Sequence, residues 1–207
     1  MTSEIMQKAD PLAQARQRTQ AFQQRMKDEG IDIALITDES SIAYLAGFWG
    51  YLSVEFGRPT FLLVRPDDMP VVITPLMESE MVSSMTWVEQ VLTWEDAGEN
   101  RWENVLAGAL GHHPGKLGVE SHSLPGMVRD QLLSHQPGST LFDIGNLLGN
   151  MRMIKSDEEI GVMRQAGEIA GAMMAAAENA LAEGVPEYEA ALAVINAGTR
   201  KAAGFLT

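Results

Sequence analysis

The segment TFLLVRPDDMPVVITP, residues 60–75, contains two apolar runs on either side of a short polar segment. Apolar runs of this length that are bounded by proline and aspartate are typical of buried strands. Pro66, Asp67 and Asp68 belong to the residue types that favour a tight reversal of the chain. The segment therefore predicts two neighbouring strands of a sheet, joined by a hairpin-type connection.

The segments on both sides of this pair alternate between helical and extended patterns. Residues 11–29 place apolar side chains at helical spacing, with Pro11 suited to the first turn and Gly30 to the C-terminal end. Further extended patterns lie at 31–38, 89–94, 116–120 and 139–144, and further helical patterns at 76–85, 100–110 and 124–135. This alternation predicts an α/β fold, a three-layer domain in which helices cover both faces of a mixed sheet.

The pattern changes after residue 150, where two long helical segments follow one another. Ser156 is suited to cap a helix over 156–183, because Glu159 stands three residues later and carboxylates favour the first turn. Its apolar face is formed by Ile160, Met163, Ala166, Ile169, Ala170, Met173 and Met174. Gly184 ends this helix, and residues 187–203 predict a second one.

Two such helices need a further surface on which to bury their apolar faces. We therefore assign residues 1–150 to one domain and residues 151–207 to the incomplete start of a second domain. The alternative is that the helix pair packs back on the first domain or on another copy of the chain.

Composition excludes several classes of function. The formal net charge is −13, from 15 Lys and Arg against 28 Asp and Glu, so we expect no nucleic-acid partner and no anionic membrane surface. No cysteine is present, which excludes disulfides, thiolate zinc sites and a cysteine nucleophile. The N-terminus has no apolar signal region and no 18 apolar residues run together. We expect a cytoplasmic protein.

Four stretches carry a resemblance to a known family. MRMIKSDEEIGVMRQAGEIAGAMMAAA at 151–177, with GVPEYEAA at 184–191, resembles the domain junction of the pita-bread metallohydrolases, the family of creatinase, prolidase and aminopeptidase P. The junction pattern R-x-x-K-S-x-x-E-I is matched by Arg152, Lys155, Ser156, Glu159 and Ile160. IALITDESSIAYLAGF at 33–48 is similar to the family's strand and following N-I-x-Y-L-x-G segment, and KLGVES at 116–121 to a later strand.

The resemblance implies a fold and a location for the chemistry. It implies a creatinase-like N-terminal domain, then two helices that open a truncated pita-bread α+β domain. In the family that second domain holds two divalent metals on two Asp, one His and two Glu, which activate a hydroxide. Those ligands lie downstream of the two opening helices, so we predict no catalytic and no metal-ligating residue here. Mn, Zn or Co is possible in the full-length protein.

Other polar clusters receive structural interpretations. His112 and His113 are adjacent in a loop, and His122 and His135 are isolated, which does not favour a metal site. We interpret Asp157, Glu158, Glu159, Glu187 and Glu189 as first-turn carboxylates of helices, and Asp67 and Asp68 as turn residues. Glu120 is expected to make a structural hydrogen bond at the end of a strand.

One motif points to a substrate. In the creatinase branch, the N-terminal domain of one subunit reaches its partner's active site, and a Phe-Gly-Arg motif before a strand holds the substrate carboxylate. Phe56, Gly57 and Arg58 match it, which makes Phe56 and Arg58 the candidate substrate-binding residues. A guanidinium grips a carboxylate bidentately, and a flat ring covers a small cationic group. The alternative is that Phe56 fills the edge of the core and Arg58 is solvated. Pro59 is consistent with an edge strand.

Three functions remain open at this point. The first is the N-terminal part of a creatinase-like or Xaa-Pro dipeptidase-like hydrolase that cleaves a C–N bond in a small amidine, amide or dipeptide. In that case this part supplies dimerisation and shapes the substrate site, is inactive alone, and works as a homodimer. The second is a non-catalytic α/β module for dimerisation or ligand binding. The third is a family member with redirected chemistry, such as a lyase or an ectoine-type ring opener.

Overall fold

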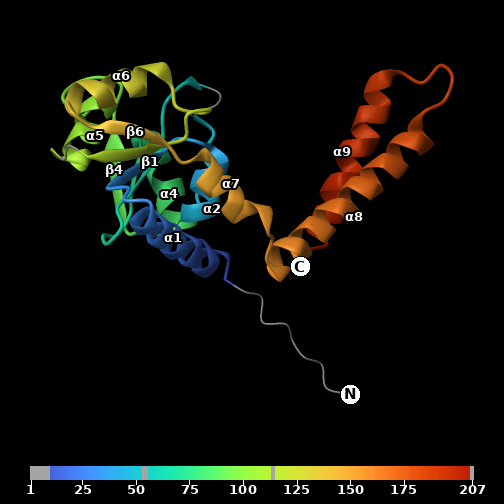
Figure 1. The fold of residues 1–207 in the computed structure, drawn as a ribbon. Helices are drawn as coiled ribbons and strands as arrows, with labels where there is room; N and C mark the ends of the chain where they lie inside the picture. Colours follow the sequence, from blue (N-terminus) through green and yellow to red (C-terminus); the bar gives the residue numbers. More distant parts are fainter. Residues whose placement is uncertain (1–9, 53–55, 113–114, 206–207) are drawn as a thin grey trace. The chain divides into compact units, whose positions relative to one another are not determined.

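The computed structural model describes residues 10–52, 56–112 and 115–205, and the chain divides into two compact units. The first unit is Met1–Arg152 and the second is Met153–Thr207. The first contains the sheet and the helices that cover it, and the second contains two long helices (Figure 1).

The first unit is built on a six-stranded mixed sheet with the strand order β4-β3-β2-β1-β5-β6. The strands are β1 (Ile33–Ile36), β2 (Phe61–Val64), β3 (Val71–Pro75), β4 (Gln90–Trp94), β5 (Lys116–Val119) and β6 (Thr140–Asp143). Strand β2 runs antiparallel to both of its neighbours, whereas β3 and β4, β1 and β5, and β5 and β6 pair in parallel. The predicted hairpin is confirmed, because Phe61 pairs with Ile73 and Leu63 with Val71.

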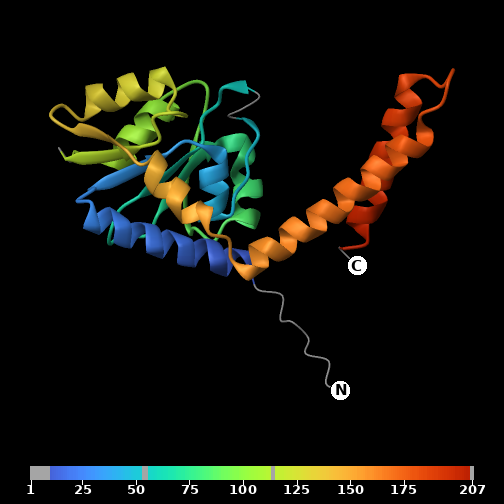
Figure 2. The ribbon, with the colours of Figure 1, turned by 45° about the vertical axis from the view of Figure 1, so that its right-hand side comes forward.

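Helices cover both faces of this sheet, as predicted. On one face lie α1 (Pro11–Asp28), α2 (Glu39–Ala46), α4 (Ser79–Met85) and α7 (Gly145–Met153), and on the other lie α5 (Trp102–Leu110) and α6 (Gly126–His135), as Figure 2 shows. Alternate residues of a strand point to opposite faces. Accordingly Leu62 and Val64 belong to one core cluster, and Phe61 and Leu63 to the other.

Among the described residues of the first unit, helices α2 and α7 were not predicted. Helix α2 begins after Asp38, whose carboxylate accepts a hydrogen bond from the Ser41 amide, and it ends at Gly47, where φ is 84°. Helix α7 contains two glycines and two asparagines, which are weak helix formers, so its pattern in the sequence is faint. Both helices follow directly from the carboxyl ends of strands β1 and β6.

The prediction of an edge position for the strand after Pro59 is wrong. Strand β2 lies inside the sheet, between β1 and β3. Pro59 stands two residues before the strand begins, so its missing N–H removes no bond from the ladder. Its carbonyl instead accepts a hydrogen bond of 3.0 Å from the Trp94 indole, which fixes the start of β2 against the end of β4.

The second unit is a pair of helices, α8 (Asp157–Ala180) and α9 (Glu187–Ala203). The predicted capping box is present, with the Ser156 hydroxyl and the Glu159 carboxylate each accepting from the other's amide. Met173 packs closely against Gly198, the one buried residue of α9, and α8 has none. Large apolar side chains remain exposed on the pair: Val162, Met163, Met174, Leu181, Val185, Tyr188, Leu192 and Ile195.

Candidate functional site

The Phe56-Gly57-Arg58 motif lies in the loop that leads into strand β2. Gly57 has a φ of 63°, a left-handed conformation that side chains disfavour, so a glycine is required for this turn. The Phe56 ring is 64% exposed, which makes the alternative of Phe56 as a core residue wrong. The Arg58 amide donates to the Leu52 carbonyl at 3.2 Å and closes the loop. The motif therefore presents an aromatic ring and a guanidinium at the surface.

The Arg58 guanidinium is held by two side chains from other loops. Its Nη2 donates to Asp96 Oδ2 at 2.5 Å, and its Nη1 lies 2.9 Å from the sulfur of Met77. Met77 follows strand β3, and Asp96 follows strand β4. Both residues were missed by sequence reasoning, because they lie 19 and 38 positions from Arg58 in motif-free segments.

Strand direction explains why these three residues meet. Strand β2 is antiparallel to β3, and β3 is parallel to β4, so the start of β2 lies at the same edge of the sheet as the ends of β3 and β4. Ligands of open α/β sheets bind outside the carboxyl ends of the parallel strands. The reversed strand thus brings Arg58 to the edge where such sites are commonly built.

Two cavities flank Arg58. One has a volume of about 240 Å³ and is lined by Phe56, Pro59, Arg101 and Trp102, among others. The other, of about 330 Å³, is lined by Pro75, Leu76 and Met77. Four residues line both: Arg58, Trp94, Glu95 and Asp96. A small ligand with a carboxylate would find a guanidinium and aromatic rings together in the first cavity.

A buried carboxylate supports the loop from below. Glu78 is only 2% exposed, and its Oε1 accepts from the amides of Tyr51 and Leu52, each at 3.4 Å. The hydroxyls of Thr60 and Thr74 donate to its other oxygen at 3.3 and 3.0 Å. Glu78 therefore ties the loop that carries the motif to strands β2 and β3, and sequence reasoning did not single it out.

The second arginine of the first cavity is engaged elsewhere. The Arg101 guanidinium makes two hydrogen bonds to the carboxylate of Glu103, at 3.2 and 2.7 Å. These bonds lower the pKa of Glu103 below its usual value, so the pair remains charged at neutral pH. Among the described residues, Arg58 gives only one hydrogen bond to a carboxylate, that of Asp96, and is therefore the better candidate to bind a ligand carboxylate.

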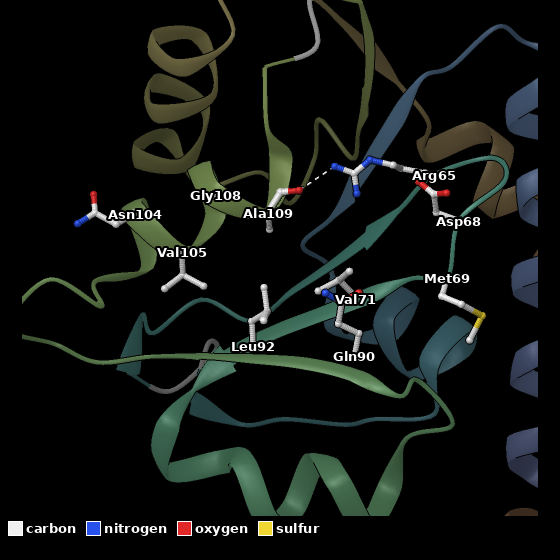
Figure 3. Close-up of a pocket in the computed structure, with 10 residues that line it drawn as sticks. All are labelled: Arg65, Asp68, Met69, Val71, Gln90, Leu92, Asn104, Val105, Gly108 and Ala109. Carbon is white, nitrogen blue, oxygen red and sulfur yellow. Dashed lines mark hydrogen bonds between the residues drawn. The ribbon is translucent and has the colours of Figure 1, made fainter.

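A further pocket, of about 550 Å³, lies at the opposite end of strand β2 (Figure 3). Its arginine, Arg65, donates to the carbonyl oxygens of Ala109 at 2.7 Å and Leu110 at 3.0 Å. A guanidinium at the last carbonyls of a helix neutralises the negative end of the helix dipole. Arg65 thus fixes the C-terminus of α5 to the sheet, a structural role.

Glu120 has the structural role that was expected of it. It is 1% exposed, accepts from the Ser41 hydroxyl at 2.6 Å and accepts from the Asp38 amide at 3.2 Å. Burial raises the pKa of Glu120, because the charged form loses hydration. These contacts join the carboxyl end of β5 to the start of α2.

The candidate metal ligands of the described residues do not form a metal site. Over residues 10–52, 56–112 and 115–205, no three His, Asp or Glu side chains converge as a bound ion would require. His112 is among the described residues, and His113 lies outside them. Asp67 pairs with Lys27 beside the hairpin.

The fold is that of an α/β domain, a six-stranded mixed sheet with helices on both faces. Residues 18–154 match the family model of the creatinase/prolidase N-terminal domain. That match covers most of the chain, so the chain belongs to the creatinase/prolidase N-terminal domain family. In the part of the chain that the structure describes, no helix is long and apolar enough to cross a membrane.

Individual relatives agree with this assignment. A creatinase from a Bacillus species is 30% identical over 84% of this chain and 42% of its own length. The agropine synthesis cyclase of Rhizobium rhizogenes is 23% identical over 89% of this chain and 48% of its own. The prolidase structure from Pyrococcus horikoshii covers 89% of this chain and 48% of its own, with 23% identity and a TM-score of 0.72, and it shows the shared fold. The chain spans about half the length of these relatives.

Proposed function

We propose that this chain is the N-terminal part of a creatinase-like or Xaa-Pro dipeptidase-like hydrolase, and that Phe56 and Arg58 contact its substrate. The observation that carries the proposal is the pairing of a half-buried guanidinium with an exposed ring at a cavity of about 240 Å³. A cavity of this size accommodates part of a dipeptide or a small amidine and excludes large ligands.

The site would act by binding and orientation. The Arg58 guanidinium takes the substrate carboxylate through charge-assisted hydrogen bonds, and the Phe56 ring covers the apolar or amidine part of the same molecule. Holding the carboxylate fixes the direction in which the scissile C–N bond points, which lowers the entropic part of the barrier. The cleavage itself would take place in the catalytic domain that residues 151–207 begin, where a divalent metal such as Mn, Zn or Co would supply a hydroxide.

The proposal includes a homodimer, in which this domain of one subunit closes the active site of its partner. The exposed apolar side chains of α8 and α9 support further burial of that unit, because isolated monomers seldom expose so many. The carboxyl-edge position of Arg58 supports a site that is completed from outside this domain.

The test is expression of the complete gene product with added Mn²⁺. Xaa-Pro dipeptides, creatine and ectoine are offered as substrates, and turnover is compared between the native protein and Arg58→Ala. Cleavage of a dipeptide or of creatine, with an increased KM in the variant, supports the proposal. An Arg58→Ala enzyme with unchanged KM for every substrate contradicts it.

A second candidate is redirected chemistry within the same family. The similarity to the agropine synthesis cyclase favours it, because that relative is named for a cyclisation. Turnover of ectoine alone among the three substrates would support this candidate. Binding of a substrate without any turnover would instead support a non-catalytic module for dimerisation or ligand binding.

A further inference from the structure

We propose that Asp96 is an internal competitor for the carboxylate site of Arg58, so that a carboxylate binds Arg58 more weakly while Asp96 keeps its place. This inference rests on the proposed function of the Phe56–Arg58 site. It assigns to Asp96 the control of affinity, which neither the family match nor any relative supplies.

The atoms that Asp96 occupies are the ones that a ligand needs. A guanidinium grips a carboxylate bidentately by pairing Nη2 with either Nε or Nη1. Nη2 of Arg58 donates to Asp96 Oδ2, and Nη1 faces the sulfur of Met77. Nη2 carries two N–H groups, one for each bidentate arrangement, and Asp96 takes one of them, so one of the two arrangements is closed while Asp96 keeps its place.

The position of Asp96 agrees with this role. Its side chain lines both cavities beside Arg58, so it stands where a ligand in either cavity would approach the guanidinium. It belongs to the turn after β4, which is closed by a hydrogen bond of 2.8 Å from the Glu95 amide to the Asn100 carbonyl. The main chain thus holds Asp96 near Arg58 in the absence of a ligand.

Displacement of Asp96 from Arg58 costs little free energy. The side chains of Arg58 and Asp96 are 34% and 62% exposed, and ion pairs of this exposure contribute little because water screens them. Once displaced, the carboxylate of Asp96 turns into solvent and is hydrated. The competition is therefore weak enough to be overcome by a substrate and strong enough to be measured.

The direct test uses the 207-residue chain and acetate as the carboxylate probe. The side-chain ¹⁵N resonances of Arg58, assigned by comparison with Arg58→Lys, are followed as sodium acetate is added at constant ionic strength. We expect Asp96→Asn to lower the half-saturating concentration by about two- to fivefold, which corresponds to about 0.4–1 kcal/mol. An unchanged or higher concentration in this variant overturns the inference.

Glu95→Gln is the matched control. Glu95 lines the same two cavities and carries the same charge. Its main-chain amide donates a hydrogen bond to the carbonyl of Asn100. If the loss of a nearby negative charge were the whole effect, Glu95→Gln would lower the half-saturating concentration of acetate as much as Asp96→Asn does. Equal effects of the two variants would therefore also overturn the inference.

The complete gene product separates this inference from the proposed function. With glycyl-proline as substrate, we expect Asp96→Asn to lower KM at unchanged kcat, and we expect this effect to disappear in the Arg58→Ala background. If Arg58→Ala alone leaves KM unchanged, the proposed function fails. If Arg58→Ala raises KM but Asp96→Asn does not lower it, only the competition fails.

Discussion

The two ends of strand β2 each carry an arginine, and the two arginines are used differently. Arg65, after the strand, gives hydrogen bonds to two main-chain carbonyls of helix α5. Arg58, before the strand, gives its hydrogen bond to an exposed carboxylate that can turn away into water. Main-chain carbonyls cannot leave without unwinding a helix, whereas a side-chain carboxylate can. One cation is committed to the fold, and the other is available to a ligand.

The largest effect on the free energy of unfolding is expected at Glu78, which holds the loop that carries Arg58. Glu78→Ala removes the acceptor of two amides and two hydroxyls in a buried setting and should lower the free energy of unfolding by about 3 kcal/mol. Chemical denaturation measures this loss. Glu80→Ala, an exposed change in the same helix region, should be nearly neutral. A loss below about 1 kcal/mol for Glu78→Ala would mean that the Arg58 loop does not depend on it.

The next effect tests the structural arginine. Arg65→Ala should lower the free energy of unfolding by about 2 kcal/mol, because the carbonyls of Ala109 and Leu110 lose a charged donor. Lys27→Ala, which breaks the exposed pair with Asp67 at the same end of the sheet, should cost less than about 1 kcal/mol. Equal costs for the two variants would remove the distinction between Arg65 and a surface cation.

The third effect tests the available arginine. Arg58→Ala should change the free energy of unfolding by less than about 1 kcal/mol, since its ion pair is exposed. In the complete gene product the same change should raise KM for a carboxylate substrate about tenfold, the loss of about 1.4 kcal/mol of binding. Arg129→Ala, an exposed arginine of α6, is the control and should leave KM unchanged. A destabilised Arg58→Ala with normal KM would reverse the comparison.

The smallest effect is expected at Glu120, which lies away from the two ends of strand β2. Burial raises the pKa of Glu120 in the folded state, so the folded protein binds this proton more tightly than the unfolded chain. The resulting stability is present below the unfolded pKa, near 4.3, and is lost as pH rises through the folded pKa. Glu120→Gln should remove this part of the pH dependence and leave KM unchanged. Denaturation at a series of pH values checks it, and parallel curves for both proteins would contradict it.

The layers of the fold were predictable because they depend on local patterns. Runs such as FLLV and VVIT must be buried on both faces, and in a chain that alternates with amphipathic helices only a covered sheet can do this. Helix α7 was not predictable in the same way, since its stability comes from Leu148 and Ile144 packing on the sheet rather than from helix propensity.

The site was only half predictable. Phe56 and Arg58 form a contiguous motif, so a resemblance could identify them. Met77, Glu78 and Asp96 reach Arg58 and its loop only because β2 is reversed between two strands, and strand order is not written in any local pattern. The same lack of information led to the wrong edge position for the strand after Pro59.

Arg58 and Asp96 lie in two loops, and Met77 lies in the short 3₁₀ helix Leu76–Glu78, all at one edge of the sheet. A change of length or residue in one loop can therefore move one contact while the other two stay in place. Such an arrangement allows substrate preference to be altered stepwise, with each step leaving a foldable protein. A domain of this construction is suited to a family whose members differ in substrate preference. A redesign of that preference would begin at the turn after β4.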